Sequence, residues 1–466
     1  MQRILDAGCV RQRVAVFAIT LLAASAFTSA RAGAPTPFAP PPDGELVLYR
    51  RATLVDSSAT PARADMDVLV SGQRIQAVFA DTPDLPASAA KARVVDLQGR
   101  YLMPGLVDSH VHLATPPNRR QAEAEMRRNL YGGVTTVRDM ADDLRVVSDL
   151  ARASLVGEIA GPDIHYAALM AGPDFFTDPR TAVTSAGGVA GQMPWMQAVT
   201  DRTNLPLAVA RASGTAPSAI KLYADLTPAL AARIAAEAHR QHLLVWAHAT
   251  LYPAKPSEVV AAGADVISHA CLLVREPLAH APRLKEPRKP FDPDRFTKGD
   301  SPELARLFAT MVRRGTILDA TIWAYAPPPS EPPAPPGTCD DVVGAAITAQ
   351  AFRAGVQISV GTDNVAPASE PWPELFHELA ELVDHAGLPP SAAIRSATLV
   401  GAKAAGREHD LGSIAPGKLA DMVVLEKDPT SSVDNLKTIV MTIKRGRAFS
   451  RSDFVPLQDE DIVDFN

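Results

Sequence analysis

The segment GLVDSHVHL, residues 105–113, places two histidines, His110 and His112, one residue apart at the end of an apolar run. In an extended strand, residues i and i+2 point to the same face. Both imidazoles can therefore reach one metal ion from the end of a single strand. Because short His-x-His pairs also arise by chance, the meaning of this pair depends on the rest of the chain.

The same context, a polar side chain at the carboxyl end of an apolar run, recurs four times downstream. The four segments are AIKLYAD with Lys221, LLVWAHA with His248, DVISHAC with His269, and QISVGTDN with Asp363. Barrel enzymes built from parallel strands keep their chemistry at this end of the strands. We therefore expect these four side chains and the histidine pair to converge on one site.

Apolar runs of strand length alternate with helical patterns between residues 104 and 410. Thr227-Pro228 is a typical helix start, with a hydroxyl N-cap and proline at the first helical position. Eight strands alternating with helices predict a parallel (β/α)8 barrel of the TIM type. A doubly wound open sheet is the structural alternative, but it would not bring the first, fourth, fifth, sixth and eighth strands to one point.

The segments on either side of the barrel have the pattern of short strands separated by turns. Residues 33–103 and 411–466 are each too short for an independent core. We therefore expect the two ends of the chain to pair into one small β-sandwich domain.

Residues 1–32 have the pattern of a secretory signal peptide, with early arginines, a short apolar run and an Ala-Arg-Ala cleavage site before Gly33. An uncleaved membrane anchor is the alternative. The expected location is secreted or periplasmic, with no stable membrane association after signal removal. In that compartment Cys271 and Cys339 either form a disulfide or remain free thiols.

Composition excludes some partners. The formal net charge is −6, with 46 basic and 52 acidic residues, and only 5% of residues are aromatic. There is thus neither a basic excess nor a stacking surface for nucleic acid. We expect a small-molecule substrate, and the sequence carries no signal for oligomeric state.

Taken together, the motifs resemble the amidohydrolase superfamily of metal-dependent hydrolases. VDSHVHL, the IK dipeptide, AHA, SHA, GTDN and the closing GSIAPGKLADMVVLEKDP occur in the expected order over nearly all of the mature chain. The resemblance is closest to the Xaa-Pro dipeptidase-like and imidazolonepropionase-related members that have a bridging carboxylated lysine. It implies the barrel, and a β-sandwich domain built from both chain ends.

The resemblance also implies a site for two divalent metal ions. The implied ligands are His110, His112 and Asp363 for one ion, His248 and His269 for the other, and Lys221 between them. Lys221 would bridge the ions after reacting with carbon dioxide to give an N6-carboxylated side chain. Histidine and oxygen ligands favour Zn²⁺, with Mn or Co as alternatives. The alternative for Lys221 is an anion-binding lysine beside a one-metal site.

Asp363 and Tyr223 are the candidate catalytic residues. Asp363 would accept a proton from the metal-bound water and pass it to the leaving amine; its alternative is a structural turn aspartate. Tyr223 lies two residues after Lys221 and so on the same face of the strand. It would donate a hydrogen bond to a substrate carbonyl or carboxylate, or pack in the core.

Other polar residues and loops are expected near the barrel. His165 either contacts the substrate or packs in the third strand. Arg138 and Asp139 are expected to form an internal ion pair. Two long loops, residues 281–300 and 327–337, are expected at the active-site face, as walls of the site or as surface decoration.

The predicted activity is hydrolysis of an amide or peptide-like C–N bond of a small substrate by metal-bound hydroxide, in an exported binuclear enzyme. A lactonase or esterase is one alternative, and a mononuclear cyclic-amide hydrolase or deaminase is another. Relatives of the mononuclear kind usually lack the bridging lysine, so Lys221 argues against it. A non-catalytic binding protein on this fold is the alternative outside enzymes; six filled ligand positions argue against it.

Overall fold

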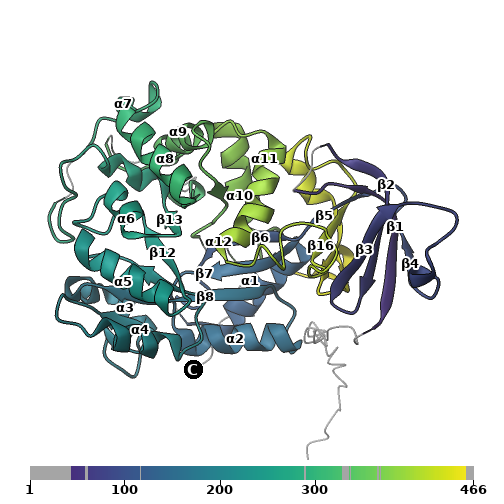
Figure 1. Cartoon of the computed structure of the whole chain (residues 1–466), viewed down its shortest axis with the longest axis horizontal. Helices are drawn as coiled ribbons and strands as arrows, with labels where there is room; N and C mark the ends of the chain where they lie inside the picture. Colours follow the sequence, from purple (N-terminus) through teal and green to yellow (C-terminus); the bar gives the residue numbers. More distant parts are fainter. Residues whose placement is uncertain are drawn as a thin grey trace, which may run out of the picture. The chain divides into compact units, whose positions relative to one another are not determined.

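The computed structural model describes residues 44–57, 61–115, 117–287, 290–327, 335, 337–364, 367 and 369–457. The predicted signal peptide lies outside the described residues. Within them the chain forms a parallel barrel surrounded by helices and a separate mixed sheet built from both chain ends (Figure 1). The predicted fold class is confirmed.

Eight parallel strands follow one another around the barrel in chain order. They are β6 (Leu106–Val111), β7 (Val134–Asp139), β8 (Asp163–Ala171), β11 (Ala219–Leu222), β12 (Leu244–His248), β13 (Val266–Ser268), β14 (Ile317–Asp319) and β15 (Ile358–Ser359). The amide of Ser109 donates to the carbonyl of Val360 at 2.7 Å, which links the last strand region to the first. The strands are almost wholly buried, as expected for a parallel sheet covered by helices.

Helices connect the strands and cover the outside of the barrel. They are α1 (Arg119–Tyr131), α2 (Leu144–Val156), α4 (Leu205–Ser213), α5 (Pro228–Arg240), α6 (Pro256–Ala262), α7 (Asp294–Thr297), α8 (Pro302–Arg314), α9 (Asp341–Arg353), α10 (Leu375–Ala380), α11 (Pro390–Arg395) and α12 (Gly401–Ala404). Thr227 caps α5 as predicted, because its side chain accepts a hydrogen bond from the amide of Leu230. None of the helices in the described part of the chain combines the length and apolar character that crossing a bilayer requires.

The connection after β8 carries an insertion that the strand–helix pattern did not predict. It contains η2 (Pro173–Thr177), α3 (Pro179–Thr184), β9 (Gln192–Met193) and β10 (Met196–Ala198). Strand β10 pairs in parallel with β8, with Met196 opposite Leu169. The insertion therefore extends the sheet at the carboxyl end of β8, the end at which the site was expected.

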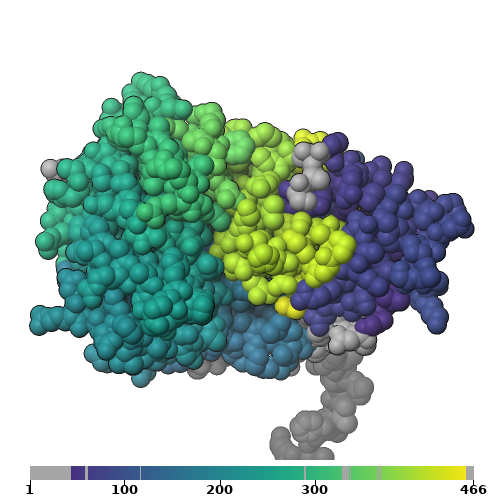
Figure 2. All heavy atoms as spheres, viewed as in Figure 1, coloured from purple at the N-terminus to yellow at the C-terminus, as the bar shows by residue number. Residues whose placement is uncertain are grey.

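The smaller unit is one hydrogen-bonded sheet of eight strands. Its strands are β1 (Leu46–Leu54), β2 (Arg63–Ser71), β3 (Arg74–Ala80), β4 (Arg93–Asp96), β5 (Tyr101–Pro104), β16 (Met422–Leu425), β17 (Ile439–Lys444) and β18 (Arg447–Ser450). Antiparallel pairing of β5 with β16 joins the two ends of the chain, and Figure 2 shows yellow C-terminal residues against purple N-terminal ones. The predicted pairing of the chain ends is confirmed, and the exact domain boundaries stay a prediction.

Arg138 and Asp139 at the end of β7 do not pair with each other, so the predicted pairing was wrong; the internal ion pair of Arg138 is with Asp319, at 3.5 Å between Nη2 and Oδ2. Arg138 donates to the carbonyls of Ser109, at 2.8 Å, and Ala404, at 3.0 Å. The Asp139 carboxylate instead accepts from the amide of Leu113 at 3.0 Å. The physical reason is that successive side chains of a strand point to opposite faces of the sheet.

Candidate active site

The predicted site residues line one cavity of about 440 Å³ at the carboxyl end of the barrel strands. They are His110, His112, Lys221, Tyr223, His248, His269 and Asp363. The structure thus brings together every residue that the strand-end pattern selected. His165 does not line this cavity; its Nδ1 lies 3.3 Å from the hydroxyl of Ser218, near the start of β11, so its packing alternative holds.

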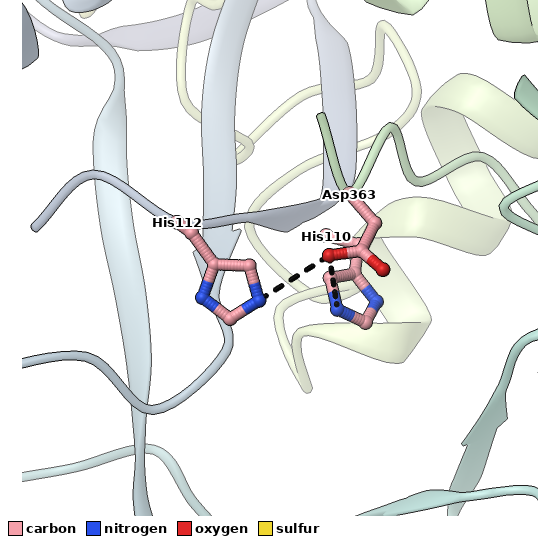
Figure 3. A group of neighbouring side chains, drawn as sticks. All are labelled: His110, His112 and Asp363. Carbon is pink, nitrogen blue, oxygen red and sulfur yellow. Dashed lines mark ion pairs between the residues drawn. The ribbon is translucent and has the colours of Figure 1, made fainter. Parts of the chain in front are cut away.

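Two histidines and a carboxylate form the tightest cluster. Asp363 Oδ1 lies 3.5 Å from His110 Nε2 and 3.3 Å from His112 Nε2 (Figure 3). The three ligand atoms all lie within 4.8 Å of one another. Imidazole nitrogens with a carboxylate oxygen are a ligand set that suits zinc and similar divalent ions.

Each ring of the His110–His112 pair is held in place by a further carboxylate of its own. His110 Nδ1 lies 2.9 Å from Asp319 Oδ2, and His112 Nδ1 lies 2.7 Å from Asp142 Oδ1. Burial alone would raise the pKa of Asp319 and of Asp142, but the histidine partners hold both below their usual values. Ionised carboxylates only accept, so each Nδ1–H donates and each Nε2 is directed towards Asp363.

Lys221 is fully buried in β11, and its Nζ has no hydrogen-bond partner among the described residues. Burial, opposed by the charges of Asp319 and Asp363, lowers the pKa of Lys221 to about 7. An unpaired buried ammonium is unfavourable, so a substantial fraction of the amine is neutral near neutral pH. The neutral amine is the form that reacts with carbon dioxide. This orphaned amine therefore fits a carboxylated lysine that holds cations.

His248 and His269 form the other side of the cluster, with ring centroids 4.5 Å apart. His269 Nδ1 lies 2.9 Å from the hydroxyl of Thr321, so its Nε2 is available as a ligand. Burial lowers the pKa of His269 to about 3, which keeps the ring in the neutral form that binds metals. These two rings and Lys221 could hold a second cation.

The backbone around the ligands is unusual. The φ angles of His269, Thr321 and Asp363 are 76°, 48° and 47°, in the region that non-glycine residues rarely adopt. Such conformations cluster at functional sites, where the surrounding structure enforces them. At Gly361 a Cβ would lie 2.5 Å from the Cβ of His110, so only glycine allows the end of β15 to approach β6.

The residues that orient the histidines were missed from the sequence. Asp319 ends β14, and the strand-end rule that found Lys221 would also have found it. Asp142 has no comparable signal, because Asp139, Asp142 and Asp143 occur together after β7. Thr321 could not be distinguished from an ordinary loop threonine.

Comparisons with known proteins agree with the motifs. Residues 342–449 match the model of the amidohydrolase family. The L-hydantoinase of Paenarthrobacter aurescens is 32% identical over 97 residues, which are 20% of this chain and 20% of that enzyme. The chain thus matches about a fifth of the length of this curated relative.

Solved structures match over a much larger part of the chain. A putative prolidase from Bifidobacterium longum has 24% identity and a TM-score of 0.65, covering 90% of this chain and 98% of that one. A Xaa-Pro dipeptidase with bound methionine has 20% identity and a TM-score of 0.64, covering 87% and 100%. At these identities the likeness shows a common fold. The matched segment, residues 342–449, is that of the amidohydrolase family, which agrees with the resemblance drawn from the motifs.

Proposed function

We propose that this protein is a binuclear metal-dependent hydrolase that cleaves an amide or peptide-like C–N bond of a small substrate. The observation that carries the proposal is the buried, partnerless Lys221 amine in a cavity with four histidines and Asp363. The matched L-hydantoinase and Xaa-Pro dipeptidase are hydrolases of C–N bonds, which supports the same class of reaction here.

The residues that would hold the metals are the ones predicted from the sequence. His110, His112 and Asp363 would hold one ion, His248 and His269 the other, and carboxylated Lys221 would lie between them. When bound, such ions polarise the scissile carbonyl and lower the pKa of water. A site of histidine and oxygen ligands favours Zn²⁺. In the one-metal alternative the buried Lys221 amine would instead bind an anion.

Asp363 is placed to move the proton. Burial alone would raise its pKa, but the neighbouring His110 and His112 hold the pKa of Asp363 well below its usual value. The carboxylate is therefore ionised and can accept a proton from the attacking water. Asp363 Oδ2 lies 3.6 Å from His269 Nδ1, so the carboxylate sits centrally between the histidines and can pass the proton to the leaving nitrogen.

Tyr223 is placed to bind the substrate carbonyl. Its ring packs on the rings of His248 and Phe175, with centroids 3.9 Å and 4.4 Å away. Burial raises the pKa of Tyr223, although Arg180 opposes the shift, so the phenol stays protonated. A protonated phenol held between two neighbouring rings can donate a hydrogen bond to an oxygen on which charge develops.

The test of the proposed function is Asp363→Asn in metal-loaded protein, assayed on dipeptides, N-acyl amino acids and lactones. The amide can still coordinate weakly but cannot accept a proton, so kcat should fall by about 10²–10⁴-fold, or roughly 3–5 kcal/mol of barrier. Metal content is measured on the same sample, and Asp434→Asn in an exposed surface pair is the matched control. A variant with two metals and near-normal kcat would remove Asp363 from proton transfer. Wild-type protein that hydrolyses lactones but no amide would shift the proposal to ester hydrolysis.

We also infer that the protein is exported. The signal-like pattern of residues 1–32 supports this, and so does a disulfide between Cys271 and Cys339, whose Cα atoms lie 5.6 Å apart. Structural disulfides persist in oxidising compartments. N-terminal sequencing of the exported fraction should find a start near Gly33, and an intact Met1 there would contradict export with cleavage.

A further inference from the structure

One side of the cavity, which we call the inner lobe, is lined by the insertion after β8 together with a residue of β8 and the residue that follows β7. The wall residues are Met140, Leu169, Phe175, Thr181, Thr184 and Met196. All six are buried, with at most 6% of their surface exposed. The Thr181 hydroxyl donates to the Asp178 carbonyl at 2.7 Å, and the Thr184 hydroxyl to the Arg180 carbonyl at 3.2 Å. Both hydroxyls are thus satisfied by the backbone, and the wall is apolar in character.

The inner lobe opens directly beside Lys221. In the parallel ladder Met196 of β10 pairs with Leu169 of β8, and Leu169 pairs with Lys221 of β11. Paired residues of neighbouring strands point to the same side of a sheet. The three side chains therefore form one row, which runs from the candidate metal bridge into the lobe. A substrate group bound in this lobe would be the one that is covalently attached next to the reacting carbonyl.

The charged groups around this cavity already have partners. Arg180 at its rim pairs with Asp178, at 2.8 Å between Nη2 and Oδ2 and 3.1 Å between Nε and Oδ1. Asp142 is occupied by His112. Apart from the candidate ligands, no unpaired charge among the described lining residues faces the lobe. A charged group bound there would lose its hydration without gaining a counter-charge, which is strongly unfavourable.

We propose that the inner lobe is the specificity subsite for an uncharged, apolar arm of the substrate, carried next to the scissile carbonyl. This proposal rests on the proposed function and adds the substrate class. The thioethers of Met140 and Met196 are flexible, so the lobe accommodates linear as well as branched or aromatic arms. Met196 closes the lobe opposite Leu169 and sets how long an arm can be.

The test measures binding of alkyl hydroxamates to the zinc-loaded protein by calorimetry. The hydroxamate group chelates the metal, and the alkyl chain, from acetohydroxamate to hexanohydroxamate, probes the lobe. Each methylene that the lobe buries should tighten binding roughly fourfold, the equivalent of about 0.8 kcal/mol. The monohydroxamate of succinate, which ends in a carboxylate, should bind no tighter than acetohydroxamate.

Two substitutions of Met196 change the lobe in opposite directions. Met196→Phe should shorten the chain length at which affinity stops rising, and Met196→Ala should lengthen it. Met441→Ala, in β17 of the other sheet, is the matched control and should leave the series unchanged. Because Met196→Ala only removes atoms, it keeps the test valid even where Met196→Phe does not fold.

The outcomes separate this proposal from the proposed function. Affinity that does not rise with chain length, a preference for the carboxylate probe, or no hydroxamate binding at all would overturn the subsite. A rising series that responds to both Met196 variants supports the subsite. If that series is found in a protein that hydrolyses no amide, the proposed function fails while the subsite stands.

Discussion

Two buried lysines, one near each end of the barrel strands, differ in whether the protein provides them with a partner. Lys221 lies one residue before the end of β11, at the cavity, and Lys444 ends β17 beside the first residue of β8; both are fully buried. Lys444 Nζ lies 2.8 Å from Asp163 Oδ1 and 3.0 Å from the hydroxyl of Ser154. Lys221 Nζ has no hydrogen-bond partner in the described part of the chain.

The difference separates a structural lysine from a functional one. Around Asp163 each cation has a carboxylate partner, because Arg445 Nη2 also lies 2.6 Å from the carboxylate that pairs with Lys444. This cluster joins the sheet of the chain ends to the barrel, and its charged groups need no ligand or modification. The Lys221 amine lowers the stability of the protein as it stands, because a buried polar group lacks a partner. A buried group that the fold leaves unsatisfied points to a ligand or a chemical modification.

The strongest test of this comparison replaces each lysine by methionine, which keeps the bulk and removes the charge. Lys221→Met should lower activity by at least about a hundredfold and remove at least one metal, because a bridging ligand contributes more than the residues that orient ligands. The free energy of unfolding of the metal-free protein should not fall, since no hydrogen bond is lost and an unsatisfied buried polar group is removed.

Lys444→Met should show the reverse pattern. Breaking a buried ion pair destabilises by about 3–5 kcal/mol, and the lower end applies because Arg445 still pairs with Asp163. Metal content and kcat at a temperature well below the melting point should stay at wild-type values. Chemical denaturation, metal analysis and kinetics on both variants decide the matter. A Lys221→Met protein with normal metal content, or a Lys444→Met protein of unchanged stability, would break the comparison.

A smaller effect is expected at the residues that orient the ligands. Asp142→Asn weakens the hold on His112 and allows the wrong ring orientation, so metal affinity or activity should fall about 10–100-fold. Asp143→Asn is the matched control, because Asp143 is the N-cap of α2 and asparagine caps equally well. Metal titration of the two variants should separate them. Equal metal affinities would show that Asp142 does not orient His112 for metal binding.

The two lysines also differ in how far their surroundings can be predicted from the sequence. The period of a strand and the geometry of a parallel barrel are both regular. The pattern of apolar runs in the sequence therefore predicts that His110, Lys221 and Asp363 lie at strand ends on one face of the barrel. Lys444 could not be placed in this way, because in IVMTIKRG it has the pattern of an ordinary strand residue. Its partner Asp163 lies far away in the sequence, and only tertiary packing brings the two together.

The wall of the inner lobe could not be predicted from the sequence, for a related reason. The insertion after β8 consists of short elements, none long enough to show a clear helical or strand period. Its role comes from the pairing of β10 with β8, which depends on register between distant residues. Specificity therefore lies in the part of the molecule where local patterns are weakest, whereas the ligands lie where they are strongest.

The smallest expected effect is the pH dependence of stability at the Asp163 cluster. Burial alone would raise the pKa of Asp163, but Lys444 and Arg445 hold it below its usual value. A carboxyl whose pKa is lower in the folded than in the unfolded protein contributes stability above the unfolded pKa of about 4, and this contribution is lost as the pH falls towards the folded pKa. The difference in unfolding free energy between the wild type and Asp163→Asn should therefore shrink as the pH falls below about 4. Denaturant unfolding of both proteins across this range measures the difference directly. A difference that stays constant through the acidic range would mean that Lys444 and Arg445 do not lower the pKa of Asp163 in the folded protein, and the Lys444 site would then be no better satisfied electrostatically than that of Lys221.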